Sequence, residues 1–171
     1  MAATMSEHIP AGLFGPYFME GTVSVEAKPK GQVVTLRTPL IANGRTTNFI
    51  ARGDLLSVAV KVYAEGGENA LHAHTSNEHI HMVLDGQATF YDDDGITTVV
   101  NKYEGMYLPM GALYYFQSTG DTNLVMMSCY AADPNHAGEG RMGADGKPLE
   151  AYSEANKHVE GTPIPGKFFG A

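Results

Sequence analysis

The chain has 171 residues, enough for one domain with a substantial hydrophobic core. Its 11 basic and 19 acidic residues give a formal net charge of −8, which argues against nucleic acid or an anionic membrane as a partner. No apolar stretch is long enough to span a bilayer, and residues 1–10 lack the pattern of a secretory signal. The single cysteine, Cys129, cannot form an internal disulfide, so we expect a cytoplasmic protein.

The first region of the chain, residues 1–21, is an arm rich in glycine, proline and aromatic residues, with no helical or strand period. Strands are expected at residues 22–27, 32–41, 46–51 and 55–63, where apolar and β-branched residues alternate or cluster. The turn signal Asn43-Gly44 separates the second of these strands from the third.

The middle of the chain continues as short strands separated by turns. Further strands are expected at residues 78–84, 87–91, 96–100, 106–108, 114–117 and 123–130. Asp85-Gly86 predicts a hairpin, and Asp94-Gly95 predicts a second tight turn. Residues 132–171 form an irregular tail in which residues 149–159 are expected to be a short helix. Many short strands with little helix predict an all-β antiparallel sandwich or barrel.

Four of the seven histidines, His72, His74, His79 and His81, fall within residues 72–81. Neutral imidazole is a good ligand for zinc, copper, iron and nickel. Because strand side chains alternate between two faces, each pair spaced by one residue places both rings on the same side. A solvated polar hairpin is the other interpretation, and it suits isolated histidines better than four at matched spacing. The pattern therefore predicts a metal site.

The order of these features resembles the cupin superfamily over about residues 55–130. The matching residues are Gly66, His72, His74 and Gly86 in the first cupin motif and Gly105, Pro109 and Gly111 in the second. The second motif is shortened between its glycine and its proline. The resemblance implies an antiparallel jelly-roll (cupin) barrel in a single domain, residues 1–171. The barrel core would span about residues 22–131, with the arm (1–21) and tail (132–171) wrapped outside.

Two positions depart from the cupin motifs. His79 stands where most cupins have a glutamate, and Tyr114 stands where the second motif has its histidine. The resemblance therefore implies a shell of His72, His74 and His79 around one divalent transition metal per subunit, iron first, with nickel, cobalt, manganese or zinc as alternatives. Glu78 would replace His79 as the ligand if the strand register were shifted by one residue.

The strand at residues 78–84 presents two different faces, and we expect both to be covered. Its odd-numbered side chains, including His79, would point into the barrel. Its more apolar face, with Ile80, Met82 and Leu84, would pack under other strands or against a second subunit. Together with the aromatic termini, this outward apolar set predicts a homodimer or larger homo-oligomer.

The expected chemistry follows from the neutral ligands. Three imidazoles leave a divalent cation with open positions and favour a chelating substrate such as an enolate, catecholate, hydroxyketone or β-diketone. A resemblance to quercetinase-like and diketone-cleaving cupins implies O2-dependent oxidative cleavage by a dioxygenase. The alternatives are a non-redox lyase, isomerase or cyclase that uses the metal as a Lewis acid, and a non-catalytic cupin that binds a small ligand.

Two side chains are the candidates for catalytic proton transfer, Tyr114 and His81. Each has a second interpretation. Tyr114 would be a fourth metal ligand if it ionised to a phenolate, and His81 would be a partner that orients a metal ligand. Substitution of each residue would separate its two roles.

Overall fold

The computed structural model describes residues 30–65, 67–136 and 140–170. The expected arm at residues 1–21 and the expected strand at residues 22–27 lie outside these ranges. The described residues form strands and two short 3-10 helices, with no α-helix among them, as the all-β prediction requires. No helix in this part of the chain has the length and apolar character needed to cross a membrane.

The elements follow one another closely along the chain. The first strands are β1 (Arg37–Ile41), β2 (Arg45–Arg52), β3 (Leu56–Tyr63), β4 (His72–His74), β5 (Asn77–Asp85) and β6 (Gln87–Tyr91). The next are β7 (Thr97–Asn101), β8 (Gly105–Leu108), β9 (Tyr115–Ser118) and β10 (Leu124–Ala132). The tail contains η1 (Pro134–His136), β11 (Arg141–Gly143), η2 (Glu154–Asn156) and β12 (Pro163–Gly170).

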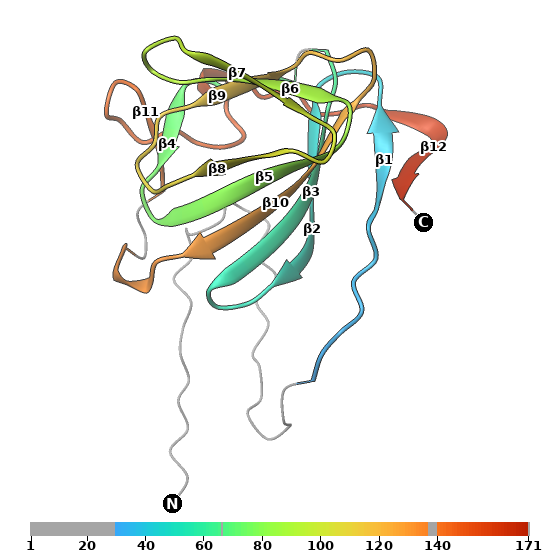
Figure 1. Cartoon of the computed structure of the whole chain (residues 1–171), viewed down its shortest axis with the longest axis horizontal. Coiled ribbons are helices and arrows are strands. Elements are labelled where there is room, and N and C mark those ends of the chain that lie inside the picture. The colour runs from blue at the N-terminus through green and yellow to red at the C-terminus, as the bar shows by residue number, and fades with distance from the viewer. Residues whose placement is uncertain (1–29, 66, 137–139, 171) are drawn as a thin grey trace, which may run out of the picture.

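Two antiparallel sheets face each other and form the predicted jelly-roll barrel (Figure 1). The larger sheet has the order β2-β3-β10-β5-β8, and the smaller has the order β7-β6-β9. The strand pair β4-β11 lies at one end of the barrel, and the pair β1-β12 lies outside the opposite end (Figure 1). Each of these pairs contains one strand from the tail, β11 or β12. The tail therefore takes part in two small sheets and does not only wrap the surface.

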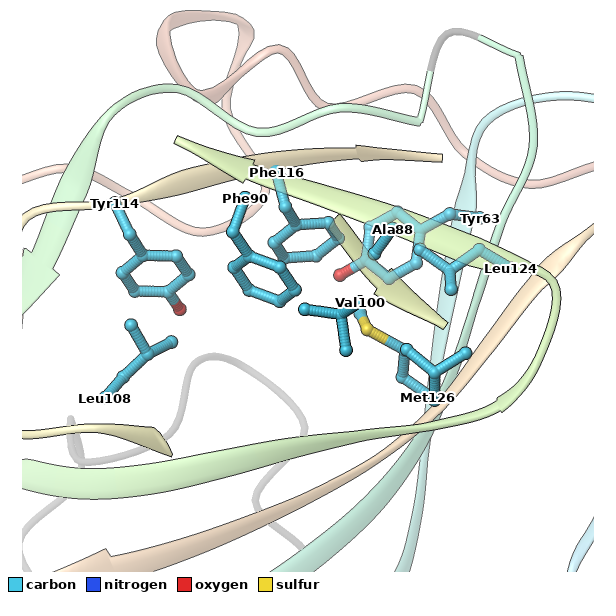
Figure 2. Packing of buried hydrophobic residues seen from close by; sticks show 10 residues of the cluster. Tyr63, Ala88, Phe90, Val100, Leu108, Tyr114, Phe116, Leu124 and Met126 are labelled. Carbon is cyan, nitrogen blue, oxygen red and sulfur yellow. The ribbon is translucent and has the colours of Figure 1, made fainter. Parts of the chain in front are cut away.

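Successive side chains of a strand point to opposite faces of the sheet. In the central strands β3 and β10, side chains on both faces are buried. One face fills the barrel, where Figure 2 shows Tyr114, Phe90 and Phe116 beside one another. The other face forms a second cluster with β1; its members are Ile41, Val60, Val62 and Val125. Leu84 packs on this second cluster, as expected for its side of β5. The predicted homo-oligomer stays a prediction.

Three expectations about individual elements were wrong. Asp85-Gly86 does not close a hairpin, because β5 pairs with β10 and β8 while β6 pairs with β7 and β9. The turn instead carries the chain from one sheet to the other; Gly86 has φ +76°, and a Cβ there would lie 2.6 Å from the Asn123 carbonyl oxygen. The strand expected at residues 32–41 begins only at Arg37, and residues 149–159 contain only the 3-10 turn η2.

Asn123 fastens β1 to the barrel. Its Oδ1 accepts a hydrogen bond from the Ile41 N–H at 2.8 Å, and its Nδ2 donates to the Ile41 carbonyl at 2.9 Å. Asn123→Ala leaves both backbone groups of a buried residue without partners. We expect the free energy of unfolding to fall by about 1–3 kcal/mol, measured by urea denaturation.

The matched control is Asn101→Ala, since both side-chain hydrogen bonds of the Asn101 amide are exposed. Its effect should stay within about 0.5 kcal/mol, as is usual for surface changes. Equal losses in the two variants would show that the Asn123 side chain does not fasten β1.

Candidate functional site

The four histidines of residues 72–81 meet inside the barrel. β4 supplies His72 and His74, and β5 supplies His79 and His81. Neighbouring ring centroids are 5.2 Å apart for His72 and His74, 4.6 Å for His74 and His79, and 4.9 Å for His79 and His81. All four rings therefore form one continuous cluster, which we call the imidazole cluster.

The register of β5 decides which of its side chains enter the barrel. His79 is 3% exposed and lies opposite Tyr130 on β10, while His81 is fully buried opposite Ser128. Glu78 points to the outside, where it is exposed and its carboxylate accepts a hydrogen bond from the Tyr107 hydroxyl at 3.0 Å. The one-residue shift that would bring Glu78 into the site is therefore not the register of this structure.

Tyr114 is fixed beside the imidazole cluster by its backbone. Its N–H donates to the His72 carbonyl at 2.9 Å, and its carbonyl accepts from the His72 N–H at 3.0 Å. The ring is buried, with Leu108 near it in Figure 2. The hydroxyl lies 2.9 Å from His79 Nε2 and 3.4 Å from His81 Nε2, so a single oxygen contacts both rings.

Hydrogen bonds at Nδ1 set the tautomer of His72. This nitrogen lies 2.7 Å from the Ala70 carbonyl oxygen, which can only accept, so Nδ1 carries the proton. The Nε2 atom is then left with a free lone pair, and it is buried without a hydrogen-bond partner. This is the form in which imidazole ligates metals, with the second nitrogen held by a carbonyl.

His81 and His74 also have a polar partner at Nδ1. The His81 atom lies 2.6 Å from Ser128 Oγ. The His74 atom lies 3.4 Å from the Asn77 amide nitrogen, while the Asn77 amide oxygen is buried without a partner. If the amide oxygen and nitrogen of Asn77 are exchanged, the oxygen accepts a hydrogen bond from His74 Nδ1–H and is no longer unpaired. His74 Nε2 becomes available in the same way as His72 Nε2.

Burial keeps the whole cluster uncharged. Desolvation lowers the pKa of His72, His74 and His81 well below the ordinary value. The same effect, strengthened by the charges of Lys61 and Arg141, lowers the pKa of His79 to about 3. Burial also raises the pKa of Tyr114 well above its ordinary value, so the phenol stays protonated. The site thus presents neutral imidazoles and a neutral hydroxyl at physiological pH.

Two cations beside the imidazole cluster were not predicted. Lys61 shares the barrel-facing side of β3 with Tyr63, is 9% exposed, and its Nζ lies 5.4 Å from the centroid of the Tyr130 ring. Arg141 lies on the tail strand β11, directly opposite His74. A lone lysine within an apolar strand was a usable signal for the first. Nothing in the sequence places a tail residue beside β4.

The site fits a metal ion in its donor chemistry, since it offers neutral imidazoles and a buried unpaired nitrogen on His72. The present arrangement of these side chains, however, is not that of a metal site. Among the described residues, no group of three or more histidine, cysteine, aspartate or glutamate side chains has the geometry of a metal site. The Tyr114 hydroxyl contacts the Nε2 atoms of both His79 and His81, so these rings would have to turn from it.

Comparison with known families identifies the fold family. A family model described as Cupin matches residues 43–141, which is more than half of the chain. The chain belongs to the cupin family. No curated protein matches it.

Solved structures with low sequence identity share the cupin fold. An uncharacterised conserved protein with a double-stranded β-helix domain from Klebsiella pneumoniae is 19% identical, with a TM-score of 0.53. The similarity covers 62% of this chain and 83% of that protein. The cupin domain of Cnp3 from Schizosaccharomyces pombe is 14% identical, with a TM-score of 0.51, over 56% of this chain and 70% of that domain. At these identities the likeness concerns the fold alone.

The buried lysine of this cupin predicts an unusual dependence of stability on pH. Burial lowers the pKa of Lys61 to about 7, whereas an unfolded chain would titrate this group near its ordinary value of about 10.4. Between these values the unfolded state binds more protons, so the contribution of Lys61 to stability rises with pH by up to about 1.4 kcal/mol per pH unit. Lys61→Met removes this contribution.

The measurement is urea denaturation of both proteins at pH 7, 8 and 9 after treatment with a chelator. The difference in unfolding free energy, wild type minus variant, should rise steadily with pH. A difference that does not change would mean that the Lys61 amine has its ordinary pKa in the folded protein.

Proposed function

We propose that this cupin is a metal-dependent enzyme acting on a small organic substrate that chelates through two oxygens. The observation that supports this most is the buried, unpaired Nε2 of His72 within a cluster of neutral imidazoles. A buried polar atom without a partner costs about 1–3 kcal/mol, which a metal bond would offset. His72, His74 and His79 would hold the ion.

Oxidative cleavage by O2 is the first reaction we propose, which makes the protein a dioxygenase. A bound iron would supply chelation of an enolate or phenolate oxygen pair and the site of reaction with O2. The chain itself would orient the substrate against the Tyr114 hydroxyl. Because that hydroxyl stays protonated when buried, it would donate a hydrogen bond to a developing oxyanion.

A non-redox lyase, isomerase or cyclase is the second candidate, and the contacts of Tyr114 favour it. The hydroxyl lies within hydrogen-bond reach of His79 and His81, and Ser128 Oγ lies 2.6 Å from the far nitrogen of His81. A proton taken from substrate by this network could be returned to it at another atom, with no net oxidation. His81 and Tyr114 would then be the acid and base.

A cupin that only binds a small ligand is the third candidate. It draws on the finding that the described side chains do not converge as a metal site. Elemental analysis of protein purified without chelators separates it from the other two. Oxygen consumption by the iron-loaded protein with a β-diketone, pentane-2,4-dione, tests oxidative cleavage. Metal present without oxygen uptake on any enolisable substrate would exclude the dioxygenase and leave the non-redox enzyme.

The ligand set can be tested by two neighbouring substitutions. We expect His79→Ala to lose most of the metal, because two remaining imidazoles rarely hold a first-row ion against water. Glu78→Ala should keep it, because Glu78 faces outward and its carboxylate accepts a hydrogen bond from the exposed Tyr107. The measurement is metal content per subunit. Loss in Glu78→Ala with retention in His79→Ala would return the site to the two-histidine, one-carboxylate arrangement of other cupins.

Tyr114→Phe tests whether the hydroxyl is a metal ligand. Since burial favours the protonated phenol, we expect metal content to be unchanged. The iron-loaded, oxidised wild type should also lack a phenolate-to-iron charge-transfer absorption. Tyr103→Phe serves as the control, because Tyr103 is 76% exposed. A charge-transfer band that disappears only in Tyr114→Phe, together with metal loss, would show phenolate ligation.

A further inference from the structure

Two basic side chains beside the imidazole cluster, the buried Lys61 and the half-buried Arg141, have no acidic partner among the described residues. The ion pairs in this part of the chain are Lys102–Asp85, Lys147–Asp145 and His158–Glu160. None involves Lys61 or Arg141. Arg141 Nε is buried without a hydrogen-bond partner, and Lys61 Nζ lies over the face of the Tyr130 ring. A charge inside a protein is costly without a partner, and burial lowers the pKa of Lys61 to about 7. An anion bound beside Lys61 would favour its charged form.

The same fold provides hydrogen-bond acceptors for another buried guanidinium. Arg45 is 7% exposed, and its guanidinium donates to His158 Nδ1 and to three backbone carbonyls, those of Glu68, Ala151 and Asn156. The chain can therefore satisfy a buried guanidinium with its own groups where the role is structural. It does not do so for Arg141 Nε.

Lys61 and Arg141 flank the same edge of the imidazole cluster. Arg141 lies directly opposite His74 in the β4–β11 ladder, and directly opposed residues share a face of the sheet. Lys61 Nζ lies over the Tyr130 ring, whose centroid is 6.3 Å from that of His74 and 5.3 Å from that of His79. Both cations thus border the His74–His79 side.

The groups facing this edge provide no negative charge. The imidazoles are neutral, as shown above, and burial raises the pKa of Tyr130 and Tyr63, so these phenols are neutral as well. After burial itself, the charge of Arg141 is the main factor that lowers the pKa of Lys61, which places the two cations within electrostatic reach of each other. The arrangement is complementary to an anion.

We propose that Lys61 and Arg141 form a binding subsite for the carboxylate of a small organic acid, beside the imidazole cluster. A guanidinium matches a carboxylate in a planar two-point geometry, and an ammonium adds a point charge from a second direction. In one respect this inference rests on the proposed function. The substrate of that enzyme would be an organic acid whose chelating oxygens reach His74 and His79 while its carboxylate contacts Lys61 and Arg141.

The test is acetate binding to the chelator-treated protein, followed by NMR at constant ionic strength, with acetamide as the uncharged probe of the same shape. Acetate is small, and removing the metal separates this subsite from any direct coordination of the probe. Wild type should bind acetate saturably and should not bind acetamide. Lys61→Met and Arg141→Gln should each raise the Kd for acetate about tenfold or more, as expected for a lost charged hydrogen bond.

Arg141→Lys keeps the charge but not the two-point geometry, so its Kd should lie between those of wild type and Arg141→Gln. Lys102→Met removes an exposed, paired lysine and should change nothing. Equal binding of acetate and acetamide, no saturation in wild type, or an unchanged Kd in both Lys61→Met and Arg141→Gln would each overturn the subsite. Because the protein is metal-free, none of these results depends on whether the imidazoles hold a metal.

Discussion

The site depends on the register in which β10 pairs with its two neighbours. β10 sets Tyr130 between Ser57 and His79, and Ser128 between Ala59 and His81. The small side chains of β3 leave room in these two rows for the rings of β5. A slip of β5 by one residue would turn His79 and His81 to the other face of the sheet and bring Glu78 inward. Burial of apolar residues on both faces of the larger sheet opposes such a slip.

Charge is the second constraint on the barrel interior. A carboxylate among the histidines would raise their pKa values and stabilise imidazolium. Here the groups that affect the imidazole cluster are Lys61 and Arg141, and both oppose its protonation. Burial and these two charges therefore act in the same direction, and the rings stay available as donors of lone pairs. The cost is an interior that holds Lys61 beside the half-buried Arg141, with neither in an ion pair among the described residues.

The sequence was sufficient for the fold class and for the grouping of the histidines, because both follow from period-two alternation and short-range spacing. It also placed His79 on the barrel side of β5, although Ile80, Met82 and Leu84 make the other face more apolar. The second cluster under β1 explains that apolar face. The hairpin expected at Asp85-Gly86 was wrong because a turn signal predicts a local bend but does not determine which strands pair across it. The position of Arg141 beside the site could not be predicted, since its neighbour His74 is distant in the sequence and the ladder that joins them is three residues long.

The two constraints together bear on the proposed metal site, in which no carboxylate would be a ligand. In the proposed enzyme, Lys61 and Arg141 would repel a divalent ion, and unit charges a few ångströms apart at a protein-like dielectric interact by on the order of a few kcal/mol. A substrate carboxylate lying on the two cations would relieve that repulsion. Substrate and metal would then each strengthen the binding of the other by the same factor, because coupling between two sites is reciprocal. A glutamate in place of His79 would neutralise the cations internally and weaken this coupling, which gives a physical reason for a histidine at that position.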